Sequence, residues 1–184
     1  MAAIYTDEGL GARPRSGGAV RCRAMKHRAA GRSGLQLSVV GLGSWLTYGT
    51  AVDQPRTDAM VRLALDRGVT FFDTADVYGQ GLAETAWGRA FAGVRRDHYV
   101  LASKAFFPMS DHPFDRGLSR KHLRSSLDAS LGRLKTDYLD LYQCHRFDPA
   151  VPIAEIVRTM DDFVTAGKIL HWGVSCWSGA QIAE

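Results

Sequence analysis

Four ionisable or hydroxyl-bearing residues stand where four successive apolar runs of the chain end. Asp73 follows 69–72, Lys104 follows 98–102, His145 follows 138–143 and Ser175 follows 169–174. Alone, an aspartate at such a place is often a turn cap, and a lysine or histidine is often a solvated loop residue. In a barrel, however, the carboxyl ends of the parallel strands meet at one mouth, where catalytic groups are placed. The four residues together therefore predict a common site.

The apolar runs predict the elements that must hold these residues. Strands are expected to start near residues 37, 69, 98, 138 and 169, with the first at Leu37–Leu42. Helices are expected after Gln54-Pro55, over Ala83–Phe91, from the N-cap Ser119, and from Pro152 to Gly167. The apolar residues Met60, Leu63 and Ala64 fall on one face of the first helix. Strand and helix alternate about every 30 residues, which indicates βαβ units and a parallel sheet.

Two arrangements of a parallel sheet remain open at this point, an open doubly wound sheet and a closed barrel. A Rossmann turn needs a third glycine, and Gly41-Leu42-Gly43-Ser44-Trp45-Leu46 lacks it. The signal for a Rossmann fold is therefore weak. Upstream, two short stretches between residues 26 and 40 flank Gly31–Gly34 and predict a small hairpin. Residues 1–25 are glycine- and arginine-rich without periodicity, so we expect a disordered extension there and one domain over 26–184.

Composition narrows the class of protein. Of the 184 residues, 46% are hydrophobic and 23% charged, as is ordinary for a globular domain. The net charge of +4 is scattered, which argues against nucleic-acid binding. Residues 33–52 are uncharged but half polar or glycine, so membrane insertion is not expected. Three distant cysteines suggest neither a disulfide framework nor a metal site, and we expect a cytoplasmic protein.

Several segments resemble motifs of the aldo-keto reductase family, in the order in which that family has them. The segment 71–79, Phe-Phe-Asp-Thr-Ala-Asp-Val-Tyr-Gly, resembles the family signature. The others are 41–45, the lysine strand 101–104, the histidine strand 138–145 and the segment 172–175. Residues 117–122 and 177–178 are similar to the branch that holds potassium-channel beta subunits and bacterial reductases.

The resemblance implies a (β/α)8 TIM-type barrel that uses NADP(H) to reduce aldehydes or ketones. The catalytic tetrad would be Asp73, Tyr78, Lys104 and His145. Tyr78 would give a proton to the developing alkoxide, and the Lys104 ammonium would lower the pKa of Tyr78. Asp73 would hold Lys104, and His145 would orient the substrate oxygen. Channel beta subunits typically have asparagine at the histidine position, so His145 favours a catalytic member.

The same resemblance places five residues around the cofactor: Ser44, Trp45, Asp73, Ser175 and Cys176. Relatives have a polar residue where Cys176 stands. Trp45 would line the substrate pocket or pack in the core. Cys144 precedes His145, but adjacent residues of a strand point to opposite faces, so a buried apolar role is favoured over a nucleophile–base pair.

Length limits the barrel. A complete barrel needs roughly 250 residues, and we count about five βα units with the N-terminal hairpin, which predicts a truncated barrel with two unpaired edges. We therefore keep three functions open: a carbonyl reductase acting on a small molecule, a cofactor-sensing regulatory subunit, and an inactive fragment. Phenylalanines in the loop 105–117 suggest an apolar or aromatic carbonyl substrate, and equally fit a loop packed on the barrel.

Overall fold

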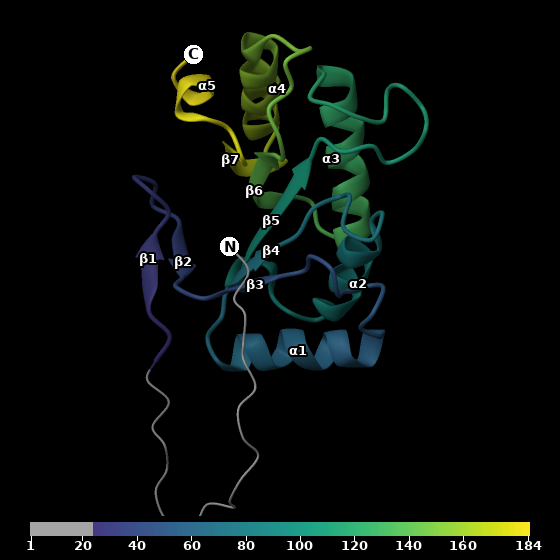
Figure 1. Cartoon of the computed structure of the whole chain (residues 1–184). Coiled ribbons are helices and arrows are strands. Elements are labelled where there is room, and N and C mark those ends of the chain that lie inside the picture. Colours follow the sequence, from purple (N-terminus) through teal and green to yellow (C-terminus); the bar gives the residue numbers. More distant parts are fainter. Residues whose placement is uncertain (1–23) are drawn as a thin grey trace, which may run out of the picture.

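The computed structural model describes residues 24–184 (Figure 1). Its strands are β1 (His27–Ala29), β2 (Gln36–Ser38), β3 (Gly41–Gly43), β4 (Phe71–Asp73), β5 (Val100–Ala105), β6 (Leu139–Cys144) and β7 (Ile169–Val174). Its α-helices are α1 (Gln54–Asp66), α2 (Leu82–Ala90), α3 (Arg120–Leu134), α4 (Ile153–Thr165) and α5 (Gly179–Ala183). A short 3-10 turn, Arg96–His98, precedes β5. The predicted extension lies, for residues 1–23, outside the described residues.

The main sheet has five parallel strands in the order β3-β4-β5-β6-β7. The spatial order thus follows the chain order, whereas a doubly wound sheet reverses direction at a switch point. Each strand is followed by a helix, and helices α1 to α4 succeed one another around one side of the sheet (Figure 1). This arrangement confirms an α/β fold consistent with five units of a barrel.

The N-terminal hairpin is confirmed, but the predicted strand 37–42 is wrong because it is two strands. β2 pairs with β1, and the chain then turns into β3, which pairs with β4. Ser38 explains the break. Its Oγ donates to the Val40 carbonyl at 2.6 Å and accepts from the backbone N–H groups of Thr70 and Phe71. These bonds end the hairpin and align β3 with β4.

An aromatic cluster fills the space between the sheet and α2. Phe72 of β4, Trp87 and Phe91 at the α2 end, and Tyr99 before β5 form edge-to-face and stacked pairs with centroids 4.2–6.2 Å apart. All four are buried. Such pairs contribute beyond simple area burial. The cluster fixes α2, and with it the loop between β4 and α2.

Helix α1 lies where predicted, and the apolar residues Met60 and Leu63 of that helix are largely exposed. Met60 is 42% and Leu63 54% exposed, whereas Thr57 and Val61 are buried. Among the described residues, no helix combines the length and the apolar character needed to cross a membrane.

The strand that holds the lysine is longer than its apolar run indicates. We predicted 98–102, but β5 extends to Ala105, so Lys104 lies inside the strand and not after it. Residues 102–105 pair with 141–144 of β6, which keeps Lys104 in the ladder. The predicted N-cap of α3 is confirmed, because the Ser119 side chain accepts from the His122 N–H.

Candidate active site

Three neighbouring strands bring the four tetrad candidates to the same end of the sheet. Asp73 is the last residue of β4, and Tyr78 lies in the loop that follows. Lys104 is the fifth of six residues in β5, and His145 directly follows β6. The contacts described below join all four. The convergence inferred from the strand ends is therefore present in the fold.

Lys104 and Asp73 form the centre of the site. The Lys104 Nζ donates to Asp73 Oδ2 at 2.7 Å and to the Thr74 carbonyl at 2.8 Å. The lysine side chain is 8% exposed and the aspartate side chain 32%, so the carboxylate is the part of the pair that solvent reaches. Gln143 of β6 approaches the other carboxylate oxygen with its Nε2 at 3.4 Å. The ammonium is thus fixed by two short bonds.

The Tyr78 ring lies close to this ion pair. Lys104 Nζ is 5.2 Å from the centroid of the ring. The sequence analysis expects the ammonium to lower the pKa of Tyr78, and the structure gives the opposite direction. Burial first, and the Asp73 carboxylate second, raise the pKa of Tyr78 to about 12, while Arg146 opposes them. The physical reason is that burial disfavours the charged phenolate, and the nearby Asp73 carboxylate disfavours it further.

His145 is a neutral imidazole at neutral pH. Burial, followed by the charges of Lys104 and Arg146, lowers the pKa of His145 to about 4. Its ring lies edge-on to Tyr78, with centroids 5.7 Å apart, and to Phe107, at 4.9 Å. The Nδ1 atom is buried and has no hydrogen-bond partner among the described residues. The ring therefore has hydrogen-bonding capacity left over.

Apart from Asp73, the residues predicted to contact a cofactor form two pairs, one that follows β3 and one that follows β7. Ser44 is buried, and its hydroxyl donates to Thr74 Oγ1 at 2.7 Å, while Trp45 beside it is 60% exposed. The core-packing alternative for Trp45 is thereby excluded. Ser175 and Cys176 follow β7, and the Ser175 N–H donates to the Cys144 carbonyl at 2.9 Å. The Ser175 hydroxyl has a long contact of 3.6 Å to the Cys176 sulfur.

The two cysteines near the site differ in environment. Cys144 is fully buried in β6, and burial raises the pKa of its thiol to about 12, which supports an apolar packing role. Cys176 is exposed in a left-handed conformation with φ of 57°. The hydrogen bond with Ser175 lowers the pKa of Cys176. In the part of the chain that the structure describes, no group of three His, Cys, Asp or Glu residues is arranged to hold a metal ion.

Sequence reasoning missed three residues around the site. Gln143 lies inside the histidine strand motif 138–145, Arg146 directly follows that motif, and Asp76 lies inside the segment 71–79. Gln143 contacts Asp73, and the Arg146 guanidinium lies 5.7 Å from the Phe107 ring. Asp76 is fully buried. Their positions next to tetrad residues were the available signal, but only the fold shows which side chains turn toward the site.

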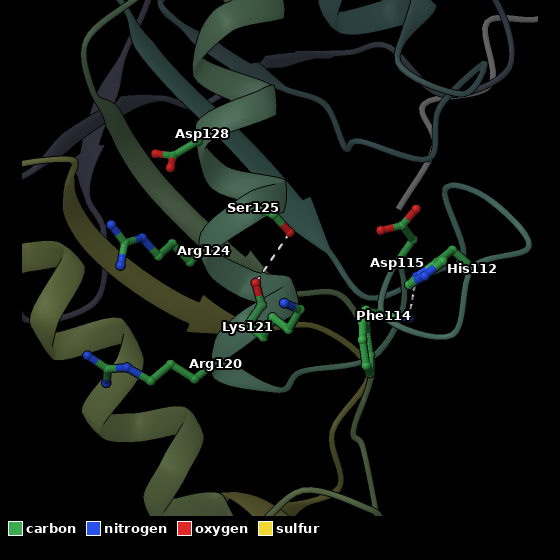
Figure 2. A pocket seen from close by; sticks show the side chains of 8 residues that line it. All are labelled: His112, Phe114, Asp115, Arg120, Lys121, Arg124, Ser125 and Asp128. Atoms are coloured by element: carbon green, nitrogen blue, oxygen red, sulfur yellow. Dashed lines mark hydrogen bonds between the residues drawn. The ribbon is translucent and has the colours of Figure 1, made fainter.

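A separate surface pocket of about 820 Å³ lies beside the start of α3 (Figure 2). It is lined by His112, Phe114, Asp115, Arg120, Lys121, Arg124, Ser125 and Asp128; none belongs to the predicted tetrad or cofactor residues, and Phe114 is one of the loop phenylalanines expected near the substrate. Two of these charges are already paired, Arg120 with Asp162 and Asp128 with Lys168. The pocket therefore stands apart from the tetrad.

Comparison with known proteins identifies the family. Residues 39–184 match the model of the aldo/keto reductase family, which covers most of the chain. The chain therefore belongs to the aldo/keto reductase family.

Individual relatives point to one branch of it. The chain is 41% identical over 162 residues to a "Probable voltage-gated potassium channel subunit beta" of Oryza sativa subsp. japonica, and equally to one of Arabidopsis thaliana. The matches cover 87% of this chain and 49% of each relative. The chain thus spans about half the length of these relatives.

Proposed function

We propose that this protein reduces aldehydes or ketones to alcohols with NADP(H), using Tyr78 as the proton donor. The observation that supports the proposal most strongly is the placement of Tyr78 beside the Lys104–Asp73 pair and the neutral His145. These are groups that a carbonyl reduction needs, a proton donor and a hydrogen-bonding group for the substrate oxygen. The family assignment supports an oxidoreductase.

Each side chain has a separate task in this proposal. An alkoxide is a stronger base than a phenolate even when the tyrosine pKa is about 12, so Tyr78 can protonate the developing alkoxide. Neutral His145 donates a hydrogen bond that fixes the carbonyl oxygen near the Tyr78 hydroxyl. Lys104 holds a positive charge beside the phenolate that forms when the proton leaves, and Asp73 fixes the position of Lys104.

The residues present fit the nicotinamide end of the cofactor. Buried His145 Nδ1 lacks a partner among the described residues, and the half-buried Ser175 hydroxyl has only its long contact to sulfur. Both therefore retain capacity for a bound group. Ser175 would hold the carboxamide, and a bound nicotinamide would supply the hydride. Cys176 and Trp45, both exposed, would lie along the same cleft.

The loop after β5 suggests the substrate class. Phe107 packs edge-on against His145, so a substrate oxygen bound at the imidazole would place its carbon skeleton near the phenyl ring. Phe106, Pro108 and Phe114 instead line a separate apolar cavity of about 660 Å³. One phenylalanine at the site favours an apolar or aromatic carbonyl compound as the substrate. We place the reaction in the cytoplasm, where NADPH is present.

Cofactor binding tests this proposal. We expect NADPH to quench tryptophan fluorescence saturably in the micromolar range, and NADH to bind more weakly. Ser175→Ala should weaken NADPH binding at least about threefold, because a hydrogen bond to the carboxamide is lost. Ser125→Ala, which removes an exposed serine hydroxyl on α3, should leave the affinity unchanged. Absence of NADPH binding by the folded protein would refute the proposal.

A second candidate is a cofactor-sensing regulatory subunit. It is favoured by the names of the relatives, which describe channel beta subunits. The two functions differ in turnover. A regulatory subunit would bind NADPH without steady reduction of aldehydes. Reduction by the wild type that is lost in His145→Ala would exclude a purely regulatory role.

A further inference from the structure

A buried polar cluster lies beneath the site and is not used by the reaction proposed above. It joins the β4–α2 loop to α2, α3, β5 and β6 and contains two carboxyl groups, those of Asp76 and Glu84, both fully buried. The charge of Glu84 is balanced by an ion pair with Arg133, whose Nε donates to it at 2.7 Å, and Ser103 Oγ also donates to Glu84 at 2.6 Å. Asp76 forms no ion pair within the described residues. Buried carboxylates without a cation are unusual and costly.

The hydrogen bonds of Asp76 tie the loop to two other elements. Its Oδ1 accepts from the N–H of Val77 at 2.6 Å, and its Oδ2 accepts from Ser126 Oγ on α3 at 2.8 Å. The Asp76 N–H donates to the backbone carbonyl of Lys104 at 3.1 Å. The side chain therefore anchors the loop to α3, and the backbone anchors it to β5 at the lysine itself.

Tyr78 depends on this anchor. Two residues after Asp76, the Tyr78 N–H donates to the Ala75 carbonyl at 3.2 Å and closes a turn. On the other side of the turn, Lys104 Nζ donates to the Thr74 carbonyl. The start of the turn that presents the tyrosine is thus held to Lys104 by two hydrogen bonds, one at Thr74 and one at Asp76.

We propose that Asp76 is a positioning residue for Tyr78: its buried carboxylate, hydrogen-bonded to Ser126 of α3, fixes the turn that places the tyrosine beside Lys104. The link to catalysis rests on the proposed carbonyl reduction. The coupling between Asp76 and Tyr78 is a property of the folded chain and is measurable without turnover.

The electrostatics agree with this geometry. Burial raises the pKa of Asp76 to about 7, with Ser126 and the Val77 N–H opposing the shift. The charges facing it are Glu84 on α2, which raises its pKa, and Arg133 on α3, which lowers it. Tyr142 of β6 is reached through Ser126, at 3.3 Å from the serine hydroxyl. Lys104 of β5 faces Asp76 with its backbone carbonyl.

The sign of the effect on catalysis follows. The negative charge of Asp76 raises the pKa of Tyr78. Below about pH 7 Asp76 is protonated, and Tyr78 gives up its proton more readily; above it, Asp76 is ionised and the proton is held more tightly. Carbonyl reduction should therefore slow by roughly threefold as the pH rises through this inflection.

Carbon-13 NMR of the whole chain tests the coupling directly. With aspartate labelled at Cγ and tyrosine at Cζ, we expect the Asp76 signal to titrate near pH 7, far above that of an ordinary aspartate. The Tyr78 signal should show an inflection at the same pH, although its own hydroxyl does not ionise there. Asp76→Asn and Tyr78→Phe assign the two signals. The proposal is overturned if Asp76 titrates below pH 5, or if the Tyr78 signal shows no inflection at the pH where Asp76 titrates.

Asp76→Asn removes a buried charge and can destabilise the fold. Two matched serine variants on α3 therefore test the same contact without changing Asp76. Ser126→Ala removes the bond to Asp76 and should move the Asp76 inflection upward by roughly half a pH unit. Ser130→Ala removes an equally buried serine whose contact is Arg133, and should leave the inflection in place. Equal behaviour of the two variants contradicts the assigned contact.

The activity profile separates positioning from a purely structural role. In Asp76→Asn the pH dependence of kcat/KM near pH 7 should disappear, with the amide still able to accept from the Val77 N–H. A structural role would lower thermal stability and leave the profile unchanged, which refutes the proposal. If reduction by the wild type is absent while the two NMR inflections coincide, the proposed function fails and the coupling stands.

Discussion

Strands β5 and β7 have the same length and direction but very different surroundings. All six residues of β5 are buried, and the strand pairs with β4 on one side and β6 on the other. In β7 only Ile169 is buried, Leu170 is 45% exposed, and among the described strands only β6 pairs with it. The sheet is therefore packed in the middle and open at this edge.

The difference divides the candidate site into two parts. Lys104, from the middle, is held by two bonds of 2.7 and 2.8 Å. Ser175 and Cys176, which follow the edge strand, have a side-chain contact of 3.6 Å with each other. The part that holds the proposed proton donor is thus preformed, whereas the part expected to meet the cofactor is less constrained. Binding energy from the cofactor would be needed to order it.

The two cysteines give the largest expected contrast between interior and edge. In a Cys22→Ser background, Cys176 should react with a thiol reagent at least a thousandfold faster than Cys144. Burial holds the Cys144 pKa at about 12, whereas the Cys176 pKa is lowered and its sulfur is exposed. The measurement is the time course of disulfide-reagent labelling at neutral pH.

The control for the labelling experiment is Cys176→Ser in the same background. It should abolish the fast phase and leave a slow phase that speeds up only with denaturant. A fast phase that survives in Cys176→Ser would show that β6 opens readily, and the contrast between the strands would fail.

Glycine substitutions test the same contrast in stability. An added Cβ at Gly88 of α2 would lie 2.2 Å from the Arg133 carbonyl, whereas at Gly173 of β7 it would lie 3.8 Å from Leu141 Cδ1. Gly88→Ala should lower the free energy of unfolding by about 3 kcal/mol through forced separation of α2 and α3. Gly173→Ala should change it by less than about 1 kcal/mol. Urea denaturation measures both, and equal losses would contradict the account.

The smallest expected effect comes from neutral His145, which makes the free energy of unfolding depend on pH. Its pKa is about 4 in the folded chain and near 6.5 when unfolded, so its contribution is complete above pH 6.5 and is lost as the pH falls toward 4. His145→Asn should remove about 2 kcal/mol of the acid sensitivity in that window. His112→Asn, on the exposed loop after β5, serves as the control. Denaturation at pH 7 and pH 4.5 compares them, and an unchanged difference in His145→Asn would disprove the assignment.

The sequence predicted the larger features of the fold because its periodicities are strong. Polar residues after apolar runs located Asp73 and His145 at one end of the sheet, and β7 was predicted with its observed bounds. The failures have local causes. The end of β5 was missed because polar Ser103 and Lys104 lie within a ladder paired with β6.

Side-chain environment was the part that sequence could not supply. The sequence places Met60 and Leu63 on one face of α1, but only tertiary contacts decide which face of the helix is buried. The direction of the Tyr78 pKa shift depended on burial and on the nearby Asp73 carboxylate. Asp76 could not be distinguished from a surface aspartate before its burial was known.

The most direct test of the central claim is NADPH-dependent reduction of an aromatic aldehyde by the wild type and by Tyr78→Phe. Oxidation of NADPH is followed by absorbance, and the alcohol product is quantified alongside it. We predict matched consumption and product in the wild type, and a rate at least a hundredfold lower in Tyr78→Phe with NADPH binding retained, since only the proton donor is lost. Equal rates in the two proteins would contradict the claim that Tyr78 donates the proton.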